Sequence, residues 1–255
     1  MTLPGVQQLY EATEITWPPA ERRRLGPWII RTGLGGGQRV SATTAATPVT
    51  AAVTAAVTAA DLAQAEAAMA ALGQPALFML RAGDVALDDL LKKAGYGVKD
   101  PVSLYACRVQ TLTATPPPRL SAFPVWPPLA VMDELWEQGG IGDGRRAVMS
   151  RAPAPKTAIL ARQNDRAAGV AFVACHRDIA MLHALEVTPA RRRQGVAVNI
   201  MRCAALWAQD NGASHLAVVV TRANEGANHL YTSLNMQNVG QYHYRIKSPT
   251  EGNKD

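Results

Sequence analysis

The C-terminal half of the chain shows the clearest pattern of apolar and polar positions. Three apolar runs of strand length, separated by short polar turns, predict three consecutive strands. The run after them has helical spacing, because Val196, Ile200, Cys203 and Trp207 fall on one face. The order of elements indicates a mixed sheet with helices packed on it. The predicted elements are helices over Ala130–Gln138, Asp143–Arg151, Gly195–Asp210 and Glu225–Leu234, and strands over Thr157–Ala161, Ala167–Cys175, Ile179–Val187, His215–Val220 and Gly240–Lys247.

The N-terminal half repeats this alternation less clearly. The Ala-rich run Ala60–Leu72 has Asp61 near its start and Gly73 after its end, which is typical of a helix. Gly35–Gly37 is interpreted as a turn and not as a phosphate loop, because no convincing helix follows it directly. The other elements predicted here are helices over Leu3–Thr16 and Ala86–Ala94 and strands over Trp28–Arg31, Val40–Val49, Ala76–Leu80 and Val102–Val109.

Prolines are concentrated in residues 113–128. Proline interrupts helices and is excluded from central strands, so this segment is predicted to be a linker. It separates a predicted domain over residues 1–112 from a second over residues 129–255. Both have an ordinary domain size.

The composition is that of a globular protein with an excess of basic residues. The 255 residues carry a net charge of +6, which suits an anionic ligand, a nucleic acid or an acidic surface. Basic and aromatic residues are not interleaved, so nucleic-acid binding is disfavoured. The three cysteines, Cys107, Cys175 and Cys203, form no CxxC pair, and we therefore expect neither disulfides nor a metal site. The sequence shows no signal peptide and no run of membrane-spanning length, so we expect a cytoplasmic protein without a membrane partner.

The stretch Val187–Ala197 carries the strongest chemical signal. It places Arg191, Arg192 and Arg193 beside Gly195, between a predicted strand and a predicted helix. A helix N-terminus presents free backbone N–H groups and partial positive charge, so it favours phosphate. The nucleotide triphosphate loop, GxxxxGK followed by Ser or Thr, is absent, and the dinucleotide pattern GxGxxG is absent as well. The stretch therefore indicates a different phosphate-binding turn.

Three segments resemble the GNAT superfamily of N-acetyltransferases. Val187-x-Pro189-x-x-Arg192-x-x-Gly195-x-Ala197 resembles its acetyl-CoA signature, Gln/Arg-x-x-Gly-x-Gly/Ala. The segment Asn224-x-x-Ala227-x-x-x-Tyr231 resembles the family's Asn-x-x-Ala-x-x-x-Tyr, and Leu234–Gly240 resembles its Leu-Gly-Phe ending, with Asn235 and Met236 departing from it. The resemblance covers about residues 150–247.

The resemblance implies an α/β GNAT fold, a mixed and mostly antiparallel sheet with helices on both faces. Leu87–Val98 is similar to the closing helix, turn and strand of the same superfamily, but no acetyl-CoA signature precedes it. Residues 1–112 are therefore expected to be a degenerate GNAT-like domain in a tandem arrangement, or else an unrelated accessory domain.

The resemblance also assigns roles to individual residues. The end of the strand before the turn, Leu185–Val187, would hydrogen-bond the pantetheine arm and the acetyl carbonyl. Asn224 would contact the pantetheine, with Ala227 in the same segment, and Tyr231 would protonate the departing CoA thiolate. The pyrophosphate would be held by backbone N–H groups of Arg192, Arg193, Gln194, Gly195, Val196 and Ala197.

The general base has two candidates, His183 and Glu186. Met181–Val187 resembles the His-x-His strand of arylalkylamine N-acetyltransferases, with His183 at the second histidine and Met181 departing from the first. A histidine of ordinary pKa, about 6.5, suits proton abstraction near neutrality. In a regular strand Glu186 would point to the face opposite His183, and a β-bulge would change that parity. A satisfied core histidine and a salt-bridged glutamate are the alternatives.

The sequence therefore predicts an enzyme that moves an acetyl group from acetyl-CoA to a primary amine by direct attack in a ternary complex. The acceptor is expected to be a small molecule or a peptide. The alternative function is a catalytically silent CoA-binding sensor or scaffold. A homodimer is compatible with the sequence, which does not fix the oligomeric state.

Overall fold

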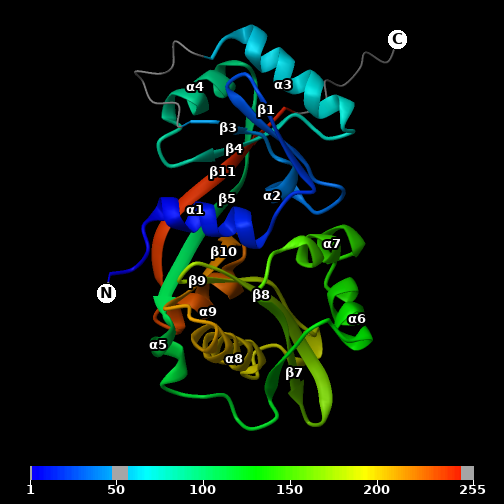
Figure 1. The fold of residues 1–255 in the computed structure, drawn as a ribbon, viewed down its shortest axis with the longest axis vertical. Coiled ribbons are helices and arrows are strands. Elements are labelled where there is room, and N and C mark those ends of the chain that lie inside the picture. The colour runs from blue at the N-terminus through cyan, green and yellow to red at the C-terminus, as the bar shows by residue number, and fades with distance from the viewer. Residues whose placement is uncertain (1, 48–56, 248–255) are drawn as a thin grey trace. The chain divides into compact units, whose positions relative to one another are not determined.

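The computed structural model describes residues 2–47 and 57–247. It divides the chain into two compact units, drawn in Figure 1. The first unit comprises Met1–Pro18 and Ser103–Gly240, and the second comprises Pro19–Val102 and Gln241–Asp255. The proline-rich segment 113–128 lies inside the first unit. The N-terminal helix belongs to this unit too, although the rest of the unit begins only at Ser103.

The first unit is built on a mixed sheet. Its strands are hydrogen-bonded in the order β5-β10-β9-β8-β7-β6. The pairs β6–β7, β7–β8 and β8–β9 are antiparallel, whereas β9 and β10 run parallel. This arrangement confirms the predicted fold class. The strands are β5 (Gly97–Arg108), β6 (Ala122–Val125), β7 (Lys156–Gln163), β8 (Arg166–His176), β9 (Ile179–Val187) and β10 (His215–Thr221).

Helices cover both faces of this sheet. Helix α8 packs against β7, β8 and β9 on one face, whereas α1 and α6 contact β8 and β9 through residues of the other face. Figure 1 shows α8 running across the strands, with α6 and α7 beside β7 and β8. The helices of the first unit are α1 (Val6–Thr16), α5 (Val109–Thr113), α6 (Ala130–Gln138), α7 (Asp143–Arg151), the 3-10 turn η2 (Pro189–Arg191), α8 (Val196–Asp210) and α9 (Glu225–Ser233).

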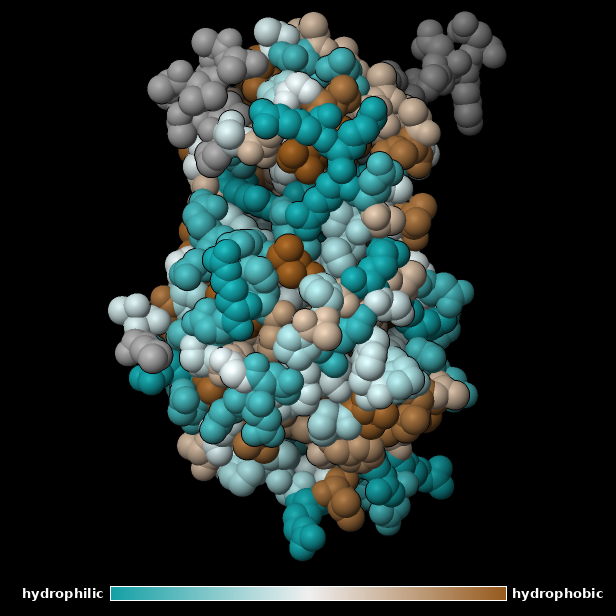
Figure 2. Space-filling model, viewed as in Figure 1, coloured by the Kyte–Doolittle hydropathy of each residue, from teal (hydrophilic) through white to brown (hydrophobic). Residues whose placement is uncertain are grey.

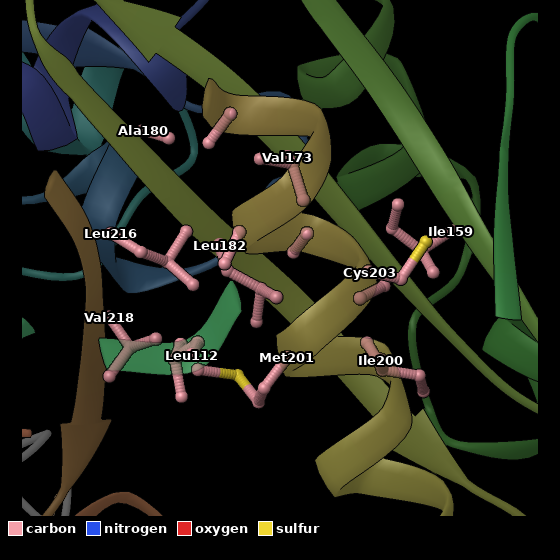
Figure 3. Close-up of a cluster of buried hydrophobic side chains, with 14 of the residues drawn as sticks. Leu112, Ile159, Val173, Ala180, Leu182, Ile200, Met201, Cys203, Leu216 and Val218 are labelled. Atoms are coloured by element: carbon pink, nitrogen blue, oxygen red, sulfur yellow. The ribbon is translucent and has the colours of Figure 1, made fainter. Parts of the chain in front are cut away.

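The main core of the first unit lies between α8 and the sheet. Figure 3 shows Ile200, Met201 and Cys203 of α8 among sheet side chains that include Leu182 and Ile159. All three cysteines are buried thiols, as the sequence predicts. Burial raises the pKa of the Cys175 thiol to about 11, because the thiolate would lose its hydration.

The second unit is smaller and has its own core. Its β1–β2–β3 sheet is antiparallel, and β4 pairs antiparallel with the end of β11. The rings of Trp28, Phe78 and Tyr96 form the centre of its core, and the Trp28 indole donates a 2.8 Å hydrogen bond to the Asp61 carbonyl. Its elements are β1 (Glu21–Leu25), β2 (Trp28–Thr32), α2 (Gln38–Ser41), β3 (Thr44–Ala45), α3 (Ala59–Ala71), β4 (Leu77–Arg81), α4 (Val85–Lys93) and the end of β11 (Gln237–Ile246).

The predicted elements differ from the structure at several places. The predicted strand Val40–Val49 is wrong: a short helix, α2, occupies its start, only Thr44–Ala45 is extended, and residues 48 and 49 lie outside the described ranges. Gly37 leads directly into α2, so the expectation that no helix follows this glycine run was wrong. The sequence also did not predict β6, an edge strand in which Pro124 is tolerated because edge strands need fewer backbone donors.

The surface is mostly polar on the face that Figure 2 shows, where hydrophobic residues occur in small groups. The exposed basic strand β1, with Arg22, Arg23 and Arg24, belongs to this kind of surface. Scattered apolar residues are normal on globular proteins. The face therefore offers no large apolar area that would mark a partner.

Candidate active site

The turn between β9 and α8 leads into the N-terminus of a helix. Gly195 is the N-terminal cap of α8 and has a left-handed φ of 82°, which favours glycine. No acidic residue lies in the first turn of α8. The first N–H groups of a helix have no partner within it, so this end of α8 presents donors together with partial positive charge.

The residues of the turn have different exposures. Arg192, Arg193 and Gln194 are exposed, and Arg192 folds back so that its Nε donates to the Val187 carbonyl at 3.2 Å. Val196 is buried and packs in the α8 core, so only its backbone faces the turn. Ala197 is half-buried. The predicted phosphate-binding residues thus lie together at one helix end.

Strands β9 and β10 separate beside this turn. Their parallel pairing ends at Leu182 opposite Val218, although β9 continues to Val187 and β10 to Thr221. Leu185, Glu186 and Val187 therefore lie beyond the last pair of this ladder, on the edge that faces β10. Backbone groups that leave a ladder are available to another hydrogen-bonding partner. The opening lies at the end of the strand where the sequence predicts the pantetheine contact.

A β-bulge lies in β9 at the same place. Phe172 of β8 pairs with His183 and Val170 pairs with Glu186, so Ala184 and Leu185 together lie opposite one residue. Ala184 has a positive φ of 50°, an unusual conformation for a non-glycine residue. Phe172 and Val170 are two residues apart and share a face of β8, so His183 and Glu186 share a face of β9. The bulge thus interrupts the alternation of side chains along β9. The side chains of both candidate bases, His183 and Glu186, therefore point to the same face of the sheet.

His183 is buried against aromatic and hydroxyl groups. Its ring centroid is 5.0 Å from that of Trp17 and 6.2 Å from that of Phe172, and its Nε2 is 2.9 Å from the Thr16 hydroxyl. Only 4% of the residue is exposed. His183 is therefore held firmly by α1, with the packing expected of a core histidine, on the face that Glu186 shares.

Glu186 lies at the rim of the opening and is half-buried. Burial raises the pKa of its carboxyl above the ordinary value, whereas the charges of Arg192 and Arg145 act in the opposite direction. A carboxylate with a raised pKa is a better proton acceptor near neutrality. Of the two candidates, Glu186 is the more accessible to a ligand.

Asn224 caps α9. Its side-chain oxygen accepts a 3.0 Å hydrogen bond from the N–H of Ala227, which links the two residues that the sequence assigns to the cofactor. Asn228, which the sequence analysis did not single out, donates to the Asn224 carbonyl at 2.7 Å and accepts from the Tyr105 hydroxyl at 3.1 Å. These bonds fix the start of α9 to β5.

Tyr231 lies one turn further along α9, with its ring 5.9 Å from the Tyr105 ring. The residue is 5% exposed, and burial raises the pKa of its phenol, which keeps the hydroxyl protonated at neutral pH. No hydrogen bond to this hydroxyl is found within residues 2–47 and 57–247. The hydroxyl is thus a proton donor without a partner in the described structure.

The separate segments meet around one apolar cluster. Val196 and Tyr231 are buried in it, and Leu185, Val187 and Ala227 pack against its edge. The end of β9, the first turn of α8 and helix α9 therefore contribute side chains to the same core.

The family model for the acetyltransferase (GNAT) family matches residues 122–236. Residues 122–236 are a GNAT acetyltransferase domain. The GNAT family is a family of acetyltransferases, which generally use acetyl-CoA.

Relatives extend the likeness beyond the GNAT domain. The uncharacterized N-acetyltransferase YobR of Bacillus subtilis (strain 168) is 22% identical over 250 residues, which covers 95% of this chain and 98% of the relative. A solved GCN5-related N-acetyltransferase from Kribbella flavida is 18% identical with a TM-score of 0.74 and 98% coverage of each chain. A tandem GNAT protein from the clavulanic acid biosynthesis pathway is 10% identical, with a TM-score of 0.56 over 75% of this chain and 70% of its own. At these identities the solved structures establish the fold.

Two further observations concern metal binding and membrane spanning. Across the described ranges, no group of three or more His, Cys, Asp or Glu side chains is placed to hold a metal ion. A search of the same residues finds no helix that combines the length and the apolar character needed to cross a bilayer.

Proposed function

We propose that this protein is an N-acetyltransferase that transfers an acetyl group from acetyl-CoA to a primary amine by direct attack in a ternary complex. The observation that carries the proposal is the opening between β9 and β10 beside the Gly195 turn. An acyl-CoA needs both features at once, a phosphate site at one end and a strand edge for its amide-containing arm. The alternative is a catalytically silent CoA-binding sensor or scaffold.

The cofactor is assigned to the residues around this opening. The backbone N–H of Arg192, expected among the pyrophosphate donors, donates to the Pro189 carbonyl at 3.3 Å. The N–H groups of Arg193–Ala197, with the charges of Arg192 and Arg193, bind the pyrophosphate. Leu185 and Val187 bind the pantetheine amides through their backbone. Asn224 and Ala227 border the arm on the α9 side. The site has a positive end for the phosphates and an apolar wall for the arm.

The reaction requires no covalent intermediate on the protein. The lone pair of the amine nitrogen attacks the thioester carbon, a backbone N–H of the β9 edge stabilises the oxyanion, and the C–S bond then breaks. The proton from the amine nitrogen passes to Glu186 or His183, and the CoA sulfur takes a proton from Tyr231. Proton return to Tyr231 through solvent leaves amide and CoA thiol as the products.

The acceptor is a small-molecule or peptide amine. The α6–α7 segment, over Ala130–Arg151, lies on the Glu186 side of the domain, because Gly139 contacts the Glu186 side chain. We assign this segment to the acceptor pocket. The buried free thiols of Cys107, Cys175 and Cys203 suit the reducing cytoplasm, where we place the protein.

The N-terminal part is proposed to be a degenerate GNAT-like domain. Within it, α4 is followed by the start of β5, in the helix-turn-strand order that closes a GNAT domain. The boundaries expected from the sequence, residues 1–112 and 129–255 joined by 113–128, differ from the compact units, because Met1–Pro18 belong to the first unit and β6, within 113–128, pairs in its sheet. The phosphate turn is assigned only to the C-terminal domain.

The function is tested with acetyl-CoA and a panel of amines. Isothermal titration is expected to detect acetyl-CoA binding, and a thiol reagent is expected to detect CoA release with at least one amine. Absence of binding at high micromolar acetyl-CoA would contradict the proposal. Binding without CoA release from any amine class would instead favour the silent sensor.

A further inference from the structure

The bulged residue of β9 is held by a tryptophan from another element. Bulging removes the carbonyl of Ala184 from the regular β8–β9 ladder, and a buried carbonyl without a partner is destabilising. The indole Nε1 of Trp136, on α6, donates to this carbonyl at 2.9 Å. Trp136 is completely buried and Ala184 is half-buried, so the bond is partly shielded from water. The unusual conformation of Ala184 thus depends on one specific donor.

The last turn of α6 also contacts the side chain that follows the bulge. A Cβ atom on Gly139 would lie 2.6 Å from Cγ and 2.8 Å from Cδ of Glu186. The φ of Gly139 is −81°, which every residue type can adopt, so the backbone does not require glycine there. The close approach of Glu186 requires it instead. From the β8 side, Gly169 leaves similar room for the Glu186 carbonyl, which a Cβ would approach to 2.7 Å.

We propose that Trp136 and Gly139 are positioning residues for acetyl transfer, Trp136 by fixing the bulge at Ala184 and Gly139 by admitting the Glu186 side chain. The inference rests on the proposed function. The bulge places His183 and Glu186 on one face and directs the backbone of Leu185 and Glu186 at the opening. Helix α6 therefore sets the geometry between the base and the edge that holds the acetyl group, although neither residue touches the reacting atoms.

The hydrogen bond of Trp136 is tested by Trp136→Phe, which removes the N–H and keeps an aromatic ring. The matched control is Trp28→Phe in the second unit, since Trp28 is equally buried and its indole also donates to a backbone carbonyl, that of Asp61, at 2.8 Å. We expect both variants to lower the melting temperature. Because small misplacements of reacting groups cost up to about a hundredfold in rate, only Trp136→Phe is expected to lower kcat, by about tenfold or more.

The KM for acetyl-CoA shows whether Trp136→Phe misplaces the reacting groups or merely destabilises the protein. It is expected to stay within about twofold in Trp136→Phe, because the phosphate site is unchanged. Equal kcat in the folded Trp136→Phe and Trp28→Phe proteins would overturn the role of Trp136.

The contact of Gly139 is tested by Gly139→Ala, which displaces Glu186 and is otherwise compatible with the helix end. Gly5→Ala is the matched control in the same unit, because Gly5 has an ordinary φ of −67° and its Cβ would lie at an ordinary 3.7 Å from Oε1 of Gln8. We expect kcat to fall about tenfold in Gly139→Ala, with a shifted pH profile, and to stay within about twofold in Gly5→Ala. An unchanged kcat and pH profile in Gly139→Ala would overturn the role of Gly139.

Turnover by the wild-type protein separates a failure of the positioning roles from a failure of the proposed function. Wild-type turnover with unaffected variants contradicts the positioning roles alone and leaves the proposed function intact. A wild-type protein that releases no CoA with any amine contradicts the proposed function, and the positioning roles with it.

Discussion

The Thr16 hydroxyl determines which nitrogen of His183 carries the proton. Thr16 Oγ1 lies 2.6 Å from the Ala12 carbonyl, to which it donates, and 2.9 Å from His183 Nε2. A hydroxyl has a single proton, so its oxygen accepts from His183, and Nε2 is the protonated nitrogen. The neutral ring therefore has its lone pair on Nδ1. Residues 167 positions apart in the sequence thus set the tautomer of one candidate base.

Replacement of Thr16 by valine is expected to destabilise the protein. Valine keeps the shape of threonine but removes the acceptor of the His183 N–H, and loss of a buried hydrogen-bond partner costs about 1–3 kcal/mol. Thr16→Ser keeps the hydroxyl and is the matched control. Denaturant unfolding measures the difference, and nitrogen chemical shifts of His183 report its tautomer. A valine variant as stable as the serine variant, with the wild-type tautomer, would contradict this account.

Replacement of Glu186 by glutamine is expected to lower activity and to raise stability. Burial raises the carboxyl pKa in the folded state, so the wild type loses stability as pH rises from the ordinary value of about 4.5 through the raised one. Glutamine does not ionise, and the variant should therefore unfold at a higher temperature above this interval and match the wild type below it. Thermal unfolding at several pH values measures the effect.

The same variant tests the base. If Glu186 accepts the amine proton, wild-type kcat/KM rises with pH as the carboxyl ionises, and the glutamine variant loses this ascending limb. A variant that keeps both rate and limb would assign the proton to His183 or to water. Asp210→Asn is a suitable control, since that carboxylate lies at the C-terminal end of α8, away from the Gly195 turn.

Replacement of Tyr231 by phenylalanine is expected to reduce turnover far more than acetyl-CoA affinity. The phenol is protonated at neutral pH and is proposed to donate to the CoA sulfur; a lost acid or base contributes about 10²–10⁴-fold. Tyr105→Phe is the control, because it removes a neighbouring hydroxyl that bonds Asn228. Steady-state kinetics with titration of acetyl-CoA measures both quantities. Equal turnover in Tyr231→Phe would exclude Tyr231 as the acid.

Replacement of Arg192 by alanine is expected to weaken CoA binding in a salt-dependent way. Arg192 is exposed at the Gly195 turn, and the attraction between exposed charges is screened over about 10 Å at 0.1 M salt. The loss of affinity should therefore shrink as salt concentration rises. Titrations at low and high salt measure it, with Arg202→Ala on α8 as the control. Equal affinity of the Arg192 variant at low salt would mean that the backbone donors bind the phosphate without this side chain.

The sequence predicts local features well and long-range ones poorly. The Gly195 turn and α8 follow from contiguous residues, and the structure confirms that helix. The predicted strand Val40–Val49 failed because its three threonines and two valines favour strands, whereas its local structure includes α2. The bulge at Ala184 was foreseen only as an alternative, because one extra residue leaves no mark in an apolar run. The bond from Trp136 joins residues 48 positions apart, and no periodicity in the sequence indicates it.

The place of α1 has a consequence for synthesis of the protein on the ribosome. This helix leaves the ribosome long before β9, because Thr16 precedes its partner His183 by 167 positions, and Trp17 contacts the same histidine. At about 5–20 residues per second, the ribosome needs on the order of ten seconds or more to add the residues between α1 and β9. Completion of the first unit is therefore delayed until most of the chain has emerged, and the apolar face of α1 must remain soluble until then.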